Sequence, residues 1–261
     1  HDEHDTYNDR MSYQTGIVWD SPKAWTVKTI YGTAYRTPFA RQLLAETEPE
    51  LEKVTTLNTT ILWTPTKYAE LSAGGFINRI DDQIMEDPYA GLSNRNHQKI
   101  KGFELGGRLN PIDNVEVTVN LTLLDNSGPD ETYRYNDYSF IGPDGEIVDH
   151  FTNLRYPFDT GPETLMNLTV KWQPLDQFTI FTRMHYFSEQ ELIYPRNETK
   201  VPIPEQWLLD MSCTIEDMFF KGTDMTLSVR NLTDNDYDLP GTYSLINGDP
   251  FEFRIEIKHR W

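Results

Sequence analysis

The residues best suited to binding a small molecule lie together between positions 133 and 140, in a segment that reads Tyr-Arg-Tyr-Asn-Asp-Tyr-Ser-Phe. Aromatic faces bind flat or ring-shaped ligands, and the polar groups between them supply hydrogen bonds. Such a surface suits sugars, catecholates or flat metal chelates. The predicted ligand-binding residues are Tyr133, Arg134, Tyr135, Asp137, Tyr138 and Phe140. The alternative is a hairpin that packs its own aromatic side chains.

No catalytic constellation accompanies this segment. The sequence lacks Gly-x-Ser-x-Gly, a phosphate-binding glycine loop and His-Glu-x-x-His, so we predict that the protein is not an enzyme. His1 and His4 stand among acidic residues, which we interpret as an acidic terminal segment, and the other histidines are scattered without ligand spacing. We therefore predict no metal site and no cofactor. Cys213 alternates with apolar residues, as a buried, inert thiol would.

Composition excludes several classes of protein. The 261 residues include 23 Lys+Arg and 41 Asp+Glu, for a formal net charge of −18, which argues against nucleic acid because phosphate binding needs a basic face. Hydrophobic residues make up 38% and aromatic residues 13%, too much for a disordered acidic tail. No run approaches the roughly 18 apolar residues of a membrane-spanning helix. A single cysteine excludes an internal disulfide framework.

The elements that position the candidate residues are long strands, because apolar and polar residues alternate with a period of two. In 251–261, Phe251, Phe253, Ile255 and Ile257 fall on one face and charged residues on the other. Most of the segments have about 9–11 residues, the length that a tilted strand needs to cross a bilayer. Eleven segments show the pattern: 12–20, 24–33, 54–64, 68–80, 98–110, 115–124, 163–173, 178–188, 206–216, 223–231 and 251–261.

The connections between these segments alternate between short and long. Tight turns are predicted at 21–23, 65–67, 111–114, 174–177 and 217–222. Long loops are predicted at 34–53, 81–97, 125–162, 189–205 and 232–250. Short turns at one end and long loops at the other are typical of outer-membrane β-barrels, and tryptophans near segment ends are typical of an interfacial girdle. The fold class is therefore predicted as all-β: an antiparallel transmembrane β-barrel portion of about eleven long strands, with short periplasmic turns and long extracellular loops.

The five long loops hold 24 acidic and 8 basic residues, so the acidity lies at one end of the molecule. This indicates either a solvated outer surface, bridged to lipid phosphates by divalent cations, or steering of a cationic ligand. Eleven strands do not close a barrel, because single-chain bacterial barrels have an even strand number and hide their edges from lipid. We therefore expect the missing strands upstream, in the same or another chain.

Several motifs resemble those of TonB-dependent outer-membrane receptors. The block Tyr31-Gly-Thr-Ala-Tyr-Arg-Thr-Pro38 with Glu48-Pro-Glu-Leu51 resembles the family's Tyr-Gly-x-x-Phe-Arg-x-Pro and Asn-Pro-x-Leu. Asp81-Asp-Gln-Ile84 and Lys101-Gly-Phe-Glu104 are similar to its Asp-x-Ile and Gly-x-Glu strands. Arg230-Asn-Leu-Thr-Asp234 with Tyr237 is similar to its Asn-Leu-x-Asp-x-x-Tyr. Trp261 stands where the family has a terminal aromatic residue.

The resemblance implies that residues 1–261 form the C-terminal half of a 22-strand barrel, without the N-terminal plug and the preceding strands. It implies active import of a scarce nutrient: a ferric siderophore, a metal complex, cobalamin or an oligosaccharide. Haem is less favoured because residues 39–47 contain no histidine. The alternatives are a passive porin-type channel and, from another class, a soluble acidic β-rich binding module.

The resemblance also implies partners and a location. The partners are the plug and remaining strands, TonB acting through the plug, the barrel-assembly machinery, outer-membrane lipid and a small-molecule ligand, without nucleic acid. The assembly signal would lie in the last strand, at Phe253, Ile255, Ile257 and Trp261. The expected location is the Gram-negative outer membrane, with the long loops extracellular and the C-terminus periplasmic.

Overall fold

The computed structural model describes residues 11–37, 51–87, 91–128, 131–156, 161–194, 199–241 and 244–260. Side chains within these ranges are described except at 84–87, 91–96, 131–137, 151–156, 193–194 and 199. The described chain is all-β, and nothing in it forms a helix long and apolar enough to cross a membrane.

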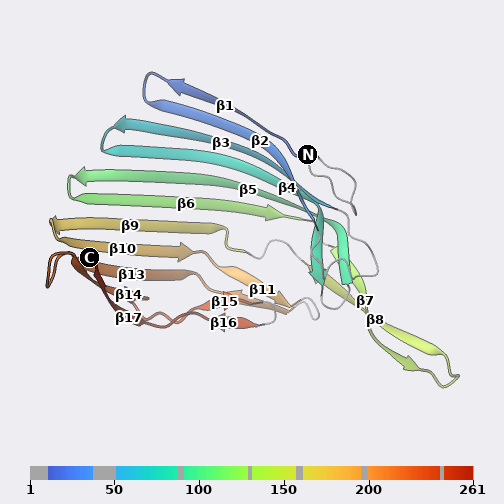
Figure 1. Ribbon diagram of the computed structural model, residues 1–261. Coiled ribbons are helices and arrows are strands. Elements are labelled where there is room, and N and C mark those ends of the chain that lie inside the picture. Colours follow the sequence, from blue (N-terminus) through green and yellow to red (C-terminus); the bar gives the residue numbers. More distant parts are fainter. Residues whose placement is uncertain are drawn as a thin grey trace.

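One 11-stranded antiparallel sheet dominates the structure, and its strands lie side by side in chain order (Figure 1). Its strands are β1 (Gln14–Ser21), β2 (Trp25–Arg36), β3 (Glu52–Thr66), β4 (Ala69–Asp87), β5 (Gly91–Ile112), β6 (Val115–Ser127), β9 (Thr164–Leu175), β10 (Phe178–Phe187), β13 (Gln206–Ile215), β14 (Thr223–Arg230) and β17 (Glu252–His259). Each corresponds to one of the eleven alternating segments of the sequence. The predicted number and order of the long strands are therefore confirmed.

Three separate two-stranded hairpins interrupt the connections between strands of the main sheet. They are β7 (Glu131–Ile141) with β8 (Ile147–Tyr156), β11 (Gln190–Tyr194) with β12 (Thr199–Ile203), and β15 (Asp238–Pro240) with β16 (Leu245–Asn247). All three belong to the long connections. The short turns lie together at the left end of the sheet in Figure 1 and the long connections at the right end, as the sequence predicts.

The register places apolar side chains on one face of the sheet, because directly opposite residues of antiparallel strands share a face. One such row runs from β1 to β13: Trp19, Val27, Ile61, Ala73, Leu105, Leu121, Met166, Tyr186 and Trp207. We call this the apolar face. Cys213 belongs to it, half-buried and opposite Ile180 and Leu227.

The other face, called the polar face below, carries hydrogen-bonding and charged groups. One row across β4 to β13 shows its character: Glu70, Arg108, Thr118, Thr169, Arg183 and Asp210. One apolar and one polar face are what the wall of a barrel with lipid outside and a polar interior requires.

The sheet is a single layer without a core of its own. Among the described residues, Ile203 is the one apolar side chain with no exposed surface, whereas Ile17, Phe103 and Ile257 are exposed at 74%, 44% and 60%. A soluble monomer rarely exposes a contiguous apolar patch larger than a few hundred Å². The apolar face therefore needs a cover, and in a barrel wall that cover is lipid.

An aromatic row marks the short-turn end of the apolar face. Trp25 and Trp63 stack across β2 and β3 with ring centroids 5.1 Å apart, and Trp19 and Trp172 lie near the same end of β1 and β9. Trp207 lies at the opposite end, where its ring is 4.3 Å from that of Tyr186. Indole rings favour the membrane–water interface, so these two levels bound an apolar band.

The prediction of a long loop over residues 81–97 was wrong, because the loop is much shorter. Strands β4 and β5 continue through most of it and reach 19 and 22 residues. The sequence does not alternate there, yet the backbone groups still pair with the neighbouring strand, and such pairing does not depend on side-chain type. The register also shifts between Ile80 and Gln83, which breaks the period of two.

Candidate functional site at the long-connection end

The long-connection end brings together the hairpin β7–β8 and the segments that flank β6 and β9. In Figure 1 the hairpin extends away from the sheet at the lower right. Its strands pair from Glu131 opposite Tyr156 to Ile141 opposite Ile147, with a shift of register between Asn136 and Tyr138. The predicted ligand-binding segment therefore forms a strand of a projecting hairpin.

Two of the six predicted ligand-binding side chains are described, and they share one face of this hairpin. Tyr138 and Phe140 are 53% and 48% exposed, and their ring centroids lie 6.2 Å apart. His150, opposite Tyr138, stacks on its ring with centroids 4.7 Å apart. The stack is of the kind that the alternative of a self-packed hairpin expects, and the rings of Tyr138 and Phe140 stay about half exposed.

The remaining four predicted residues, Tyr133, Arg134, Tyr135 and Asp137, lie in β7 with side chains outside the described residues. Their role in ligand binding stays a prediction. His1 and His4 also lie outside the described residues. Within the described ranges, no three His, Cys, Asp or Glu side chains converge as metal ligands would.

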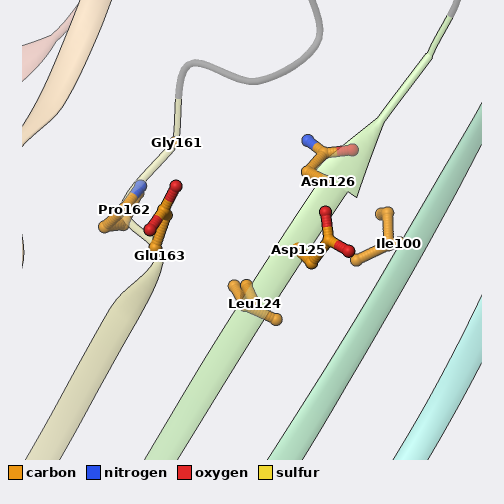
Figure 2. Close-up of a pocket in the computed structure, with 7 residues that line it drawn as sticks. All are labelled: Ile100, Leu124, Asp125, Asn126, Gly161, Pro162 and Glu163. Carbon is orange, nitrogen blue, oxygen red and sulfur yellow. The ribbon is translucent and has the colours of Figure 1, made fainter.

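A hollow of about 410 Å³ opens where β6 and β9 separate (Figure 2). It is lined by Ile100, Leu124, Asp125, Asn126, Gly161, Pro162 and Glu163. Figure 2 shows the side chains of Asp125 and Asn126 at the end of β6, across from Glu163 at the start of β9. The hollow therefore combines an apolar wall with two carboxylates, of which Asp125 pairs with Lys101 at 3.1 Å.

A second hollow of about 620 Å³ adjoins the first and shares Gly161 and Glu163 with it. Its lining adds Thr164, Ser188, Glu189, Gln190, Glu191, Pro202, Ile203 and Pro204. Lys200 forms an ion pair with Glu191 at 2.7 Å, so Glu163 and Glu189 supply most of its negative charge. Both hollows favour cationic or neutral groups over anionic ones, because like charges repel. Sequence reasoning missed both, because no motif marks residues that converge from separate connections.

The motif at 230–237 builds a turn and does not face a hollow. Asn231 is 4% exposed and has a left-handed backbone with φ 47°. Its amide group donates to the carbonyl oxygens of Asn235 at 2.9 Å and Asp249 at 3.2 Å, and its Oδ1 accepts from the backbone N–H of Asn235 at 3.0 Å. Asp234 Oδ1 accepts from the backbone N–H of Phe251 at 3.1 Å. The motif therefore ties the connection between β14 and β17 together.

This turn is anchored to the polar face. The backbone N–H of Asn231 donates to Asp210 Oδ1 at 3.0 Å, and Asp210 also pairs with Arg183 at 2.9 Å. Asn235 donates to the carbonyl oxygen of Trp207 at 2.9 Å. Asp210 thus joins the connection between β14 and β17 to strands β10 and β13. Its position in the sequence does not indicate this role.

The last strand carries the predicted assembly signal on the apolar face. Phe253, Ile255 and Ile257 lie opposite Val229, Leu227 and Met225 of β14. They are 53%, 56% and 60% exposed. Trp261 lies outside the described residues. The shared apolar face of the three described residues agrees with the predicted alternation, and recognition by the assembly machinery stays a prediction.

The fold and its two faces define a class: the wall of a large outer-membrane β-barrel with its long connections at one end. The sequence matches the family described as "TonB dependent receptor-like, beta-barrel" over residues 1–232, and the chain belongs to this family. Proteins of this family are outer-membrane β-barrels, which confirms the resemblance found in the motifs. No curated protein matches the sequence.

Solved structures show the same fold at low sequence identity. The siderophore receptor PiuA from Acinetobacter baumannii is 16% identical with a TM-score of 0.69, over 94% of this chain and 35% of that chain. The FrpB iron transporter from Neisseria meningitidis is 13% identical with a TM-score of 0.72, over 94% and 38%. The ferric enterobactin receptor from Pseudomonas aeruginosa is 15% identical with a TM-score of 0.70, over 97% and 40%. The chain thus spans less than half the length of these proteins.

Proposed function

We propose that this chain forms the C-terminal half of the barrel of an energy-coupled importer, which takes up an iron–siderophore complex across the outer membrane. The observation that carries the proposal is the two-faced sheet with sorted connections, in a chain of the TonB-dependent receptor family. An apolar face toward lipid leaves the polar face for the lumen, where a plug would sit. Three similar structures are named as a siderophore receptor, an iron transporter and a ferric enterobactin receptor, which supports iron among the candidate nutrients.

The charge of the two hollows narrows the substrate class. Glu163 lines both hollows and Glu189 lines the second, whereas Asp125, the other carboxylate of the first hollow, is paired with Lys101 at 3.1 Å. A ferric tris-catecholate is strongly anionic and is repelled by these carboxylates, whereas a cationic or neutral hydroxamate chelate is attracted or tolerated. We therefore propose a neutral or cationic ferric chelate as the ligand, before cobalamin or an oligosaccharide.

The hairpin β7–β8 is the proposed first contact for that ligand. The open rings of Tyr138 and Phe140 provide a stacking surface in the connection between β6 and β9, and the side chains predicted at 133–137 would extend it. Aromatic surfaces bind organic chelates of either charge, so this hairpin would supply affinity while the hollows supply charge selection.

The proposed mechanism needs partners in addition to this chain. The polar face would contact the plug, and TonB acting through the plug would open the path for the bound chelate. The long connections would lie outside the cell and the C-terminus on the periplasmic side, where the assembly machinery reads the last strand. A passive porin differs because it conducts ions without a plug and without energy coupling.

Uptake of radioactive iron by whole cells tests the proposal. Cells that depend on this protein, starved of iron, should accumulate a labelled neutral or cationic hydroxamate chelate, and loss of TonB should abolish the uptake. Uptake that persists without TonB, together with steady ion conductance of the purified protein in planar bilayers, would establish the porin alternative instead.

Binding to the purified protein tests the ligand class. The double variant Glu163→Gln, Glu189→Gln should bind a cationic hydroxamate chelate about fivefold more weakly, because two attractive charges near a partly exposed site together contribute about 1 kcal/mol. The matched control Asp113→Asn, in a short turn, should leave binding unchanged. Tighter binding of an anionic tris-catecholate than of the hydroxamate by the unaltered protein would contradict the proposed charge selection.

A further inference from the structure

A basic patch interrupts the apolar face at the long-connection end of β3, β4 and β5. One row of the register crosses four strands there: Thr55 of β3, Arg79 of β4, Lys99 of β5 and Ser127 of β6. The neighbouring row nearer the middle of the sheet contains Leu57, Ile77, Lys101 and Asp125. Arg79 and Lys99 are thus direct cross-strand neighbours on the face that we assign to lipid.

This pairing is unfavourable unless an anion compensates it, because like charges directly opposite each other destabilise an antiparallel pair. The described contacts compensate only part of the charge. Asp81 accepts from Arg79 Nε at 2.7 Å, and Asp125 accepts from Lys101 at 3.1 Å. Among the described side chains, Arg79 has its ion pair with Asp81, and the Lys99 ammonium has no partner. Lys53, opposite Asp81, adds another positive charge.

The patch also has the shape for an amphipathic ligand. A hollow of about 570 Å³ is lined by Thr55, Leu57, Ile77, Arg79, His97, Lys99, Ser127 and Gly128. Leu57 and Ile77 are exposed at 42% and 41%, directly beside the cations. The hollow therefore offers an apolar wall on the side of the membrane interior and hydrogen-bond donors on the side of the long connections.

The distance of the basic patch from the tryptophan row places the patch at the interface between membrane and water. Along β3, Thr55 lies eight residues from Trp63, which is about 27 Å at roughly 3.4 Å per residue. A strand tilt of about 40° reduces this to about 20 Å, close to the roughly 25 Å band of an outer-membrane barrel. The tryptophans mark one edge of that band, so the basic patch lies near the other edge.

We infer that this basic patch binds the phosphate groups of an anionic lipid in the outer leaflet of the membrane. The acyl chains would lie on Leu57 and Ile77, and the phosphate would accept hydrogen bonds from Arg79, Lys99 and Ser127. Clusters of basic residues at a membrane surface attract anionic headgroups, and guanidinium groups bind phosphate with two parallel hydrogen bonds. The inference is independent of the transported substrate and requires only that the apolar face meets lipid.

Lipid binding to the purified protein in non-ionic detergent, followed by native mass spectrometry, tests the inference. The probe is bisphosphorylated lipid A, compared with the same lipid from which both phosphates have been removed. The double variant R79Q/K99Q should bind the phosphorylated lipid about thirtyfold more weakly, because each lost charge weakens binding about fivefold to sixfold. The variant R79K/K99R, which keeps both charges, should bind like the unaltered protein.

The control variant K28Q/K171Q removes two exposed lysines from the polar face of the same sheet and should bind like the unaltered protein. Equal binding by R79Q/K99Q, or equal binding of the lipid without phosphates, would overturn the inference. Competition by millimolar inorganic phosphate that displaces the lipid would show a site for free phosphate and would overturn the assignment to lipid. For each variant, a heated sample that migrates more slowly in electrophoresis than an unheated one would establish that the barrel is folded before heating.

Discussion

The substitution Asn231→Ala should destabilise the protein strongly although Asn231 lines neither hollow. The side chain makes three hydrogen bonds, two to carbonyl oxygens and one from a backbone N–H, and the residue is 4% exposed. Each bond contributes about 1 kcal/mol net, and alanine at φ 47° adds about 1 kcal/mol of backbone strain that asparagine tolerates. The expected loss is therefore about 4 kcal/mol of unfolding free energy.

Guanidinium unfolding in lipid vesicles, followed by tryptophan fluorescence, measures this loss. Trp207 is a local reporter because its carbonyl oxygen accepts from Asn235. Asn231→Gly also loses the three hydrogen bonds, but glycine adopts this backbone conformation without strain. It should therefore lower the unfolding free energy by about 3 kcal/mol. The matched control is Thr233→Ala, an exposed position of the same motif, and should stay within about 0.5 kcal/mol. If Asn231→Ala also stays within that margin, the structural role of the motif is refuted.

Three further predictions concern the two faces of the sheet. Val119→Arg places a charge in the middle of the apolar band and should cost about 2–4 kcal/mol in the same unfolding assay. Gly102→Val should cost about 1 kcal/mol, since a Cβ at this position displaces the ring of Phe76 on the polar face and lies 3.1 Å from the carbonyl oxygen of Leu123. Asp210→Asn should cost about 1–2 kcal/mol, because it weakens a half-buried ion pair and the acceptor for the turn at Asn231.

Matched changes in the same sheet separate these effects from a general loss of stability. Asn120→Arg puts the same charge one residue away on the polar face and should cost less than about 1 kcal/mol. Glu70→Gln removes an ion pair with Arg108 whose two side chains are exposed, and should cost less than about 0.5 kcal/mol. Equal losses for Val119→Arg and Asn120→Arg would contradict the assignment of the faces, and equal losses for Glu70→Gln and Asp210→Asn would contradict the special role of Asp210.

The long strands were predictable because the environment imposes their pattern. A wall between lipid and a polar interior requires alternation over its whole width, and segments such as 115–124 show it without interruption. The alternation also distinguishes the two faces, which is why Cys213 and Ile255 were placed correctly. The tight turns followed from proline and aspartate between apolar runs.

The long connections were less predictable because this constraint ends where water covers both faces. The extension of β4 and β5 and the hairpins β11–β12 and β15–β16 depend on backbone pairing, which leaves little trace in side-chain type. The acidic hollows and the contact between Asp210 and Asn231 depend on residues far apart in the chain. Pattern alone does not show such convergence.

Labelling of single cysteines on intact cells tests the central claim most directly, namely that the sheet is a barrel wall with its long connections outside. In a Cys213→Ser background, Tyr138→Cys in the hairpin and Asp113→Cys in a short turn each supply one target. A membrane-impermeant maleimide should label position 138 on intact cells and position 113 only after the outer membrane is permeabilised. Labelling of position 113 alone on intact cells, or recovery of both variants in the soluble fraction, would contradict the account.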